Sequence, residues 1–127
     1  MSAATLLAAA VDEVCVVDQS VPYRPTRLAP GLAYVEPADP WKEPTESFRG
    51  VSVGLVVVLV AGSTDPLEAI EWLDVQTSAL MAATPVDVGD DDIEAVAVGA
   101  PILLVDDGGG SFLACRVEFS RFTTEGA

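Results

Sequence analysis

An apolar run occupies the middle of the chain, in the stretch GLVVVLVAG at residues 54–62. It is unbroken from Leu55 to Ala61, rich in valine and bounded by glycine at both ends. A short β-branched run of this kind predicts a buried strand, whereas a membrane-spanning helix needs about 20 apolar residues. Odd positions from Val51 onwards are apolar, and even positions become apolar from Val56. The pattern therefore predicts a central strand that is buried on both faces.

A helical pattern follows in the stretch DPLEAIEWLDVQTSALMA. Asp65 is placed to cap the helix, Pro66 suits the first helical position, and Glu68 can complete a capping box. The spacing predicts a helix over 66–83 whose core face consists of Ile70, Leu73, Thr77, Leu80 and Met81. A weaker apolar stripe lies on roughly the opposite side and consists of Trp72, Val75, Ala79 and Ala82. This stripe is either exposed to solvent or in contact with a second subunit.

The two ends of the chain carry simpler signals. Residues 2–18 have helical spacing with Ser2 as the cap, and the β-branched tail VCVVD weakens the last turn. The C-terminal part predicts a hairpin in which Ile93–Val105 and Phe112–Phe122 flank the turn DDGGG. Within the first of these strands, Gly99 and Pro101 indicate a bulge or an edge position.

Residues 21–46 differ in kind, because six of the nine prolines fall there. Proline lacks the donor that a sheet interior needs, so this arm is predicted to be mostly extended coil, with at most a short strand over 32–36. Tyr23, Tyr34 and Trp41 stand among the prolines. Aromatic side chains in an extended arm predict docking onto a surface, either of the same chain or of a neighbour.

These elements predict an α+β fold in one domain over residues 1–127. The predicted fold is one mixed or antiparallel sheet of about four strands packed by the central helix. An N-terminal helix over 1–20 and the proline-rich arm over 21–46 precede this sheet-and-helix core, which spans 47–127.

Composition adds two expectations to the fold. Half of the residues are hydrophobic and only 20% are charged, which favours a chain that hides part of its surface in an assembly. The formal net charge is −14, with seven acids and four bases before residue 51, and thirteen acids and two bases after it. Such a chain lacks the basic face that sequence-specific DNA binding requires. The N-terminus has no basic region preceding an apolar one, so a soluble, non-secreted chain is expected.

The residues give little support to catalysis. The chain has no histidine, so the commonest general base and metal ligand is missing. The loop AGSTDP after the central strand lacks the lysine and glycines of a phosphate-binding loop. Cys15 and Cys115 stand in apolar surroundings, which is typical of buried thiols. We therefore expect no enzymatic activity, no cofactor and no metal centre.

The densest acidic cluster is VDVGDDDIEA, which contains Asp87, Asp90, Asp91, Asp92 and Glu94. It does not follow the EF-hand pattern, so it is interpreted as a solvated loop, with weak calcium binding as the alternative. A second acidic pair, Asp106 and Asp107, lies in the glycine-rich turn.

The order of these elements resembles that of the tail terminator proteins of long-tailed bacteriophages, particularly those of actinobacterial hosts. The resemblance is carried by the proline-bounded segment AYVEPADPWKE, the strand FRGVSVGLVVVLVAG, and the acidic helix with its Leu73–Asp74 pair. It implies a hexameric ring that caps the tail tube, stops its polymerisation and meets the head-completion protein, with phage DNA passing through the lumen. It also implies a place in the virion, after assembly in the host cytoplasm.

Two other function classes fit the same sequence. One is an acidic binding module that mimics nucleic-acid charge, and the other is a different connector or a tail-tube subunit. In the ring, carboxylates on the bore would repel DNA and keep it centred. We therefore expect one acidic loop, either Asp90, Asp91 and Asp92 or Asp106 and Asp107, to line the lumen or face the tube. Subunit contacts are expected at Tyr23, Tyr34, Trp41, Trp72, Val75 and Ala79.

Overall fold

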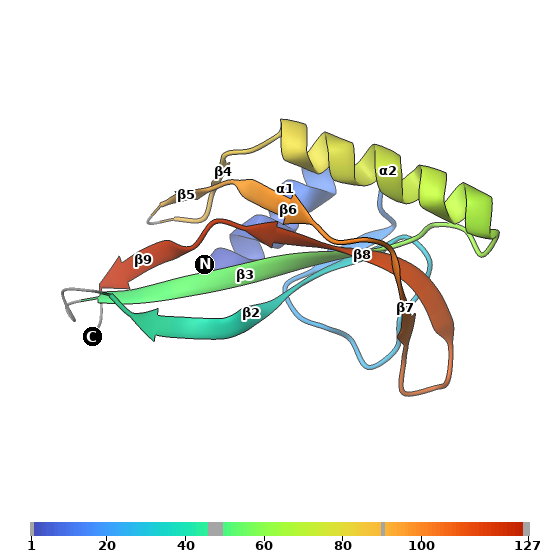
Figure 1. The fold of residues 1–127 in the computed structure, drawn as a ribbon, viewed down its shortest axis with the longest axis horizontal. Coiled ribbons are helices and arrows are strands. Elements are labelled where there is room, and N and C mark those ends of the chain that lie inside the picture. The colour runs from blue at the N-terminus through green and yellow to red at the C-terminus, as the bar shows by residue number, and fades with distance from the viewer. Residues whose placement is uncertain (1, 46–49, 90, 126–127) are drawn as a thin grey trace.

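A computed structural model describes residues 2–45, 50–89 and 91–125 (Figure 1). Helix α1 (Ala3–Val14) opens the chain, and helix α2 (Pro66–Ala82) follows the third strand. The strands are β1 (Gln19–Val21), β2 (Leu32–Pro44), β3 (Gly50–Val60), β4 (Val86–Asp87), β5 (Asp92–Ile93), β6 (Ala95–Val98), β7 (Ile102–Val105), β8 (Ser111–Phe119) and β9 (Phe122–Glu125). The predicted α+β class with two helices and a mixed sheet is confirmed.

Strand β3 lies at the centre of the main sheet. The neighbouring strands run in the order β1–β2–β3–β8–β6, with β7 also paired to β8 and β9 also paired to β3. Only the β1–β2 pairing is parallel, and every other described pairing is antiparallel. A separate two-stranded ribbon joins β4 to β5. The apolar run therefore forms a strand with neighbours on both sides, as the pattern of buried positions predicts.

The two faces of the sheet are covered differently (Figure 1). Helices α1 and α2 lie on one face, together with the β4–β5 ribbon, and we call this the helix face. Odd-numbered residues of β3, such as Val57 and Leu59, are buried there against Leu7 and Leu73. The opposite face, which we call the open face, is covered by the segment 22–31 that joins β1 to β2, and Leu104 and Phe112 of the β7–β8 hairpin also pack against its core. Even-numbered residues of β3 form a second, smaller core beneath that segment.

The helix ends follow from local chemistry. Ser2 caps α1 by accepting a hydrogen bond from the Thr5 N–H at 3.1 Å. Asp65 caps α2 by accepting one from the Leu67 N–H at 3.3 Å, and Pro66 begins the helix. Glu68 does not complete a capping box, because its carboxylate accepts a hydrogen bond from the Ser63 hydroxyl at 2.9 Å instead. Both predicted N-terminal caps are thus in place, but the predicted capping box of α2 is not formed.

The predicted core face of α2 is only partly right. Leu73, Thr77 and Leu80 are buried, but Ile70 is 49% exposed and Met81 is 46% exposed. The buried residues that replace them are Ala69 and Gln76. The side chain of Gln76 accepts a hydrogen bond from the Val16 N–H at 2.8 Å, which satisfies a backbone donor in the segment after α1. As a result, the buried face of α2 is rotated about the helix axis from the predicted apolar face. The rotation is roughly half of the 100° that separates successive residues.

The predicted four strands and the extended arm are corrected by the structure. The main sheet has seven strands, because β1 adds one strand and short interruptions divide β6 from β7 and β8 from β9. The arm contains a 13-residue strand, β2, which pairs with β3 from Ala33 to Pro44. Beyond Tyr34, β2 has β3 as its one neighbour among the described strands, so a missing N–H donor is tolerated at Pro37 and Pro44. A break in register between Pro37 and Lys42 accommodates Pro40.

The predicted C-terminal hairpin is present between β7 and β8. Ile102 pairs with Ala114 and Val105 pairs with Ser111 around the turn. Gly109 adopts a φ of 81°, a conformation that glycine reaches without steric cost. Inward and outward positions alternate along the second half of β8, where Cys115, Val117 and Phe119 are buried on the helix face while Glu118 is exposed.

We predict that Val57→Asp prevents stable folding. Val57 is fully buried on the central strand, so the variant places an unpaired carboxylate in the core at a cost of about 3–5 kcal/mol. Urea unfolding measures the loss. The matched control is Val96→Asp on β6, where the native side chain is 60% exposed and little change is expected. A Val57→Asp protein with the stability of the control would contradict the central position of β3.

Candidate functional site

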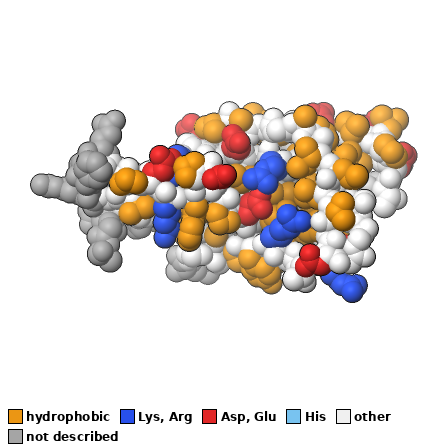
Figure 2. All heavy atoms as spheres, turned by 60° about the horizontal axis from the view of Figure 1, so that its bottom comes forward, with side chains coloured by type: hydrophobic (Ala, Val, Ile, Leu, Met, Phe, Trp, Pro, Cys, Tyr) orange, Lys and Arg blue, Asp and Glu red, His pale blue; other side chains and the backbone are white. Residues whose placement is uncertain are grey.

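The open face carries most of the described positive charge. Arg24 and Arg27 lie in the segment 22–31, Arg116 projects from β8, and Arg121 follows it. Figure 2 shows Lys and Arg side chains gathered on this side of the molecule among hydrophobic ones. By contrast, α2 contains Glu68, Glu71 and Asp74 and has no basic residue. The few bases of this acidic chain are therefore concentrated on one face.

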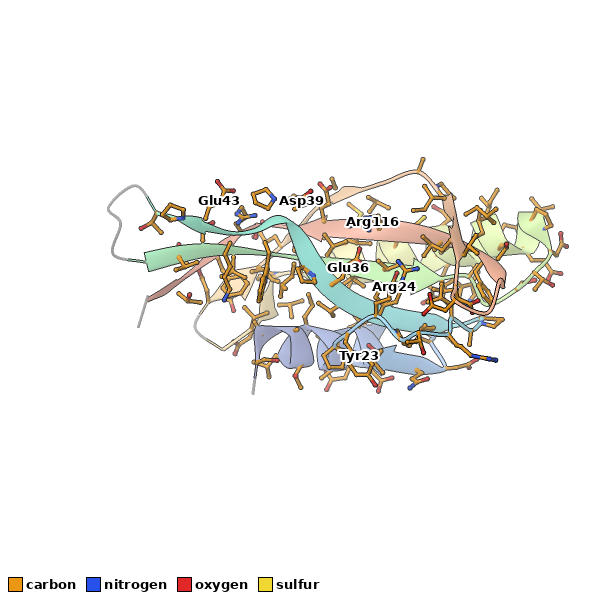
Figure 3. The ribbon with its side chains drawn as sticks, turned by 90° about the horizontal axis from the view of Figure 1, so that it is seen from below. Tyr23, Arg24, Glu36, Asp39, Glu43 and Arg116 are labelled. Atoms are coloured by element: carbon orange, nitrogen blue, oxygen red, sulfur yellow. The ribbon has the colours of Figure 1, made fainter. Side chains whose placement is uncertain are left out.

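An ion pair crosses the central strand on this face. The guanidinium of Arg116 contacts the carboxylate of Glu36, and the two flank β3 because Glu36 pairs with Val56 while Arg116 pairs with Val58. Figure 3 shows Arg24 close to this pair in the same view. The Arg116 side chain is 43% exposed and that of Glu36 is 16% exposed. At such exposure the pair stabilises the fold by about 1 kcal/mol or less.

Tyr34 lies beneath this charged group. Its side chain is 1% exposed and packs in the second core with Val58. Burial raises the pKa of the Tyr34 hydroxyl, the carboxylate of Glu36 raises it further, and Arg24 and Arg116 oppose the rise. The hydroxyl therefore stays protonated around neutral pH. Tyr34 is a core residue of its own chain, so its ring does not form the predicted contact with a neighbour in this conformation.

Arg121 fastens the irregular part of β2 to β3. It donates to the carbonyl oxygens of Pro40 at 2.7 Å and Trp41 at 3.2 Å, and to the hydroxyl of Ser52 at 2.9 Å. Gly54 leaves the space for this side chain, because a Cβ there would stand 2.6 Å from the guanidinium. A groove of about 290 Å³ runs between Arg121 and Arg116. Both guanidiniums at its ends already have partners in the chain, so the groove is a surface feature and not a vacant anion site.

The Asp106 carboxylate organises the tip of the β7–β8 hairpin. It accepts hydrogen bonds from the N–H groups of Gly108 at 3.0 Å and Gly110 at 2.8 Å within the turn. Its other oxygen accepts one from the Leu28 N–H at 3.0 Å, which ties the hairpin to the segment 22–31. The bonds from Leu28 and Gly110 are the main causes that hold the pKa of Asp106 below its usual value. Asp106 therefore has a structural task, whereas Asp107 is exposed.

The other predicted aromatic and apolar contact residues lie on several surfaces. Tyr23 is 60% exposed on the segment 22–31, and Trp41 is 48% exposed beside Lys42, whose amine stands 4.2 Å from its ring centre. On α2, Val75 is 60% exposed, while Trp72 and Ala79 are half-buried. These side chains do not form one patch.

The predicted acidic loops lie at opposite ends of the molecule (Figure 1). Asp91 and Asp92 are exposed in the β4–β5 ribbon, and Asp107 is exposed at the tip of the β7–β8 hairpin. Asp90 falls outside the described residues. Within the described part of the chain, no group of three or more His, Cys, Asp or Glu residues is arranged to hold a metal ion.

The sequence did not reveal two sets of surface residues. The arginine cluster on the open face was missed because its members come from distant segments of the chain. The exposed stripe of α2 was missed because Ile70 and Met81 were placed in the core. The alternation along β8 and the lack of basic residues in α2 are the signals that point to these surfaces.

The two thiols are inert. Cys15 and Cys115 are buried and unpaired with each other, and burial raises the pKa of both, that of Cys15 to about 11. Cys15 contacts the carbonyl oxygen of Gln76 at 3.6 Å through its sulfur. Thiols of this kind are packing residues and not nucleophiles.

Known proteins offer no guide to the site. No family model matches this chain. No curated protein and no solved structure matches it either. In the described ranges, neither helix has the length and apolar character needed to cross a bilayer.

We predict that Asp106→Asn lowers the melting temperature at pH 7. The amide has only one acceptor oxygen, so one of the N–H groups of Leu28, Gly108 and Gly110 loses its partner. Since the folded-state pKa of Asp106 is depressed, its stabilising contribution is present above the ordinary carboxyl pKa and is lost as pH falls through the depressed value. Thermal scans at pH 7 and at pH 3 should therefore show a smaller difference between variant and wild type at pH 3.

The matched control is Asp107→Asn, which changes the same charge at the neighbouring exposed position. It should leave the melting temperature within about 1 °C of the wild type. An equal effect of the two variants would contradict the structural task of Asp106.

Proposed function

We propose that this chain is a non-enzymatic structural subunit that assembles with copies of itself into a closed ring. The observation that carries the proposal is exposed apolar surface on opposite sides of one small molecule. On the outer side of α2, Leu67 is 65% exposed, Ile70 49% and Met81 46%. On the other side, Tyr23 is 60% exposed and Ile102 is 39% exposed. A subunit in a ring needs two different contact surfaces, one for each neighbour.

The amount of exposed surface supports the same proposal. The chain exposes 7115 Å² of accessible surface at a mass of 13.2 kDa. A compact monomer of that mass exposes about 6,400 Å². The chain therefore exposes about 700 Å² more than an average compact monomer of its mass.

Within this class, we propose that the ring is a phage tail terminator. The resemblance in element order supports it, with a helix, a proline-bounded strand, the central VVVLV strand, an acidic helix and a C-terminal hairpin. In this role the ring is hexameric, caps the tail tube and meets the head-completion protein in the virion. DNA passes through its lumen without specific binding, which suits a chain of net charge −14.

An acidic binding module is the second candidate, and the same net charge favours it. Such a module would act as a monomer or dimer on a basic partner. Such a module needs only one binding surface, however, so this function does not explain the exposed apolar side chains on the second side of the molecule.

Electron microscopy and light scattering of the purified chain test the ring. We expect particles with six-fold symmetry, a central pore and a mass near six times 13.2 kDa, either alone or at one end of tubes formed by the tail-tube protein of the same genome. Short capped tubes are expected when the chain is added during polymerisation. A monomer that leaves tube length unchanged would refute the tail-terminator role.

We predict that Trp41→Ala weakens assembly about tenfold and leaves subunit melting nearly unchanged. The Trp41 side chain is half exposed and is stacked by Lys42, so its removal deletes interface area without opening the core. Sedimentation velocity and thermal scans measure the two effects separately. A sharp fall in melting temperature with unchanged assembly would show that Trp41 packs on its own subunit.

A further inference from the structure

The exposed side of α2 combines carboxylates with large apolar side chains. Residues at a helical spacing of three and four place Leu67, Glu71, Asp74 and Met81 along one line of the helix, and Ile70 flanks it. All five are exposed, and the Glu71 and Asp74 carboxylates have no salt-bridge partner among the described residues. We call this line the outer stripe. A helix of 17 residues is about 25 Å long, so the stripe extends over several helical turns.

The open face carries the complementary set. Tyr23, Arg24, Arg27, Ile102 and Arg116 form what we call the arginine face. Arg24 and Arg27 make no salt bridge within the described ranges. Arg24 also donates to the Val105 carbonyl at 3.4 Å, which fixes the segment 22–31 beside β7. Exposed tyrosine and arginine are the side chains that contribute most to protein interfaces.

We propose that the outer stripe of one copy docks onto the arginine face of the next copy. Glu71 and Asp74 would pair with Arg24 and Arg27, while Leu67 and Ile70 would cover Tyr23 and Ile102. The proposal rests on the proposed ring and names the charged part of the contact between its neighbouring subunits. Charge complementarity selects a second copy as the occupant, because the same chain supplies both an exposed acidic-apolar helix and an exposed arginine-apolar sheet face.

The position of the two surfaces fixes the symmetry of the contact. Figure 1 places α2 on the upper side of the sheet and the segment 22–31 on the lower side, and Figure 2 shows the basic side chains on that lower side. A contact between opposite sides of identical subunits is head-to-tail. Such contacts close into rings when the rotation per subunit divides the circle and otherwise grow into filaments.

Charge reversal on the helix gives the decisive test. Glu71→Arg with Asp74→Arg makes the net charge less negative by four, which on its own lessens repulsion between copies and favours association. The docking contact predicts the opposite, a weakening of about ten- to a hundredfold in sedimentation velocity and light scattering. The matched control is Asp12→Arg with Glu13→Arg on the exposed side of α1, which changes net charge equally and should not weaken association.

Compensation provides the second measurement. Arg24→Glu with Arg27→Glu should also weaken association, and combining all four substitutions in one chain keeps the net charge of the wild type. The combined chain should associate within about threefold of the wild type. A mixture of the helix variant and the Arg24→Glu, Arg27→Glu variant should likewise assemble, with the two kinds of subunit alternating around the ring.

The outcomes separate this contact from the proposed ring. If the wild type forms rings and the helix variant associates as tightly, the docking contact is overturned and the ring stands. If the combined chain stays as weak as its parents, the charge pairing is overturned. If the wild type remains monomeric at every concentration tested, with and without tubes, both proposals are overturned together.

Discussion

Strand β3 is bonded to neighbours on both sides and, from Val53 onwards, has buried side chains on both faces, and the other elements are arranged to satisfy that constraint. Helices α1 and α2 are needed to cover Val57 and Leu59, while the segment 22–31 is needed to cover Val58 on the opposite face. A strand so apolar is stable only in the middle of a sheet. Removing an edge strand would therefore leave β3 buried, whereas removing the helices or the segment 22–31 would expose its apolar side chains.

Local chemistry made the centre of this fold predictable from the sequence. The run around Val57, the cap at Asp65 and the turn at Asp106–Gly110 each depend on neighbouring residues in the chain, and each is found where it was expected. The start of β2 lies in the short strand considered over 32–36, but its continuation to Pro44 was missed. Prolines predict against a sheet interior, and no local signal shows that this part of the strand has only one strand neighbour. The rotation of α2 was missed because it depends on the bond from Val16 to Gln76, which joins residues 60 positions apart.

The candidate surfaces were harder to predict for the same reason. Arg24, Glu36 and Arg116 come from three separate parts of the chain. The register of β2 and β8 on β3 brings Glu36 and Arg116 together, and the segment 22–31 places Arg24 near them. The sequence places most of the net negative charge after residue 50, but it does not show on which face the few bases lie. The fold concentrates arginines on the open face and leaves α2 wholly acidic. Charge patterning of this kind is a property of the folded chain and not of its composition.

The free edge of β2 also bears on how the chain avoids aggregation. An unpaired strand edge offers N–H and C=O groups to any other extended chain, and a long apolar sheet such as this one is at risk of growing into fibres. Along that edge, Pro37, Pro40 and Pro44 lack the donors that such growth needs, and Lys42 adds a charge. The prolines that made this segment resemble a coil thus protect the edge of the sheet. The large apolar side chains exposed elsewhere on the molecule are therefore not combined with an unprotected strand edge along β2.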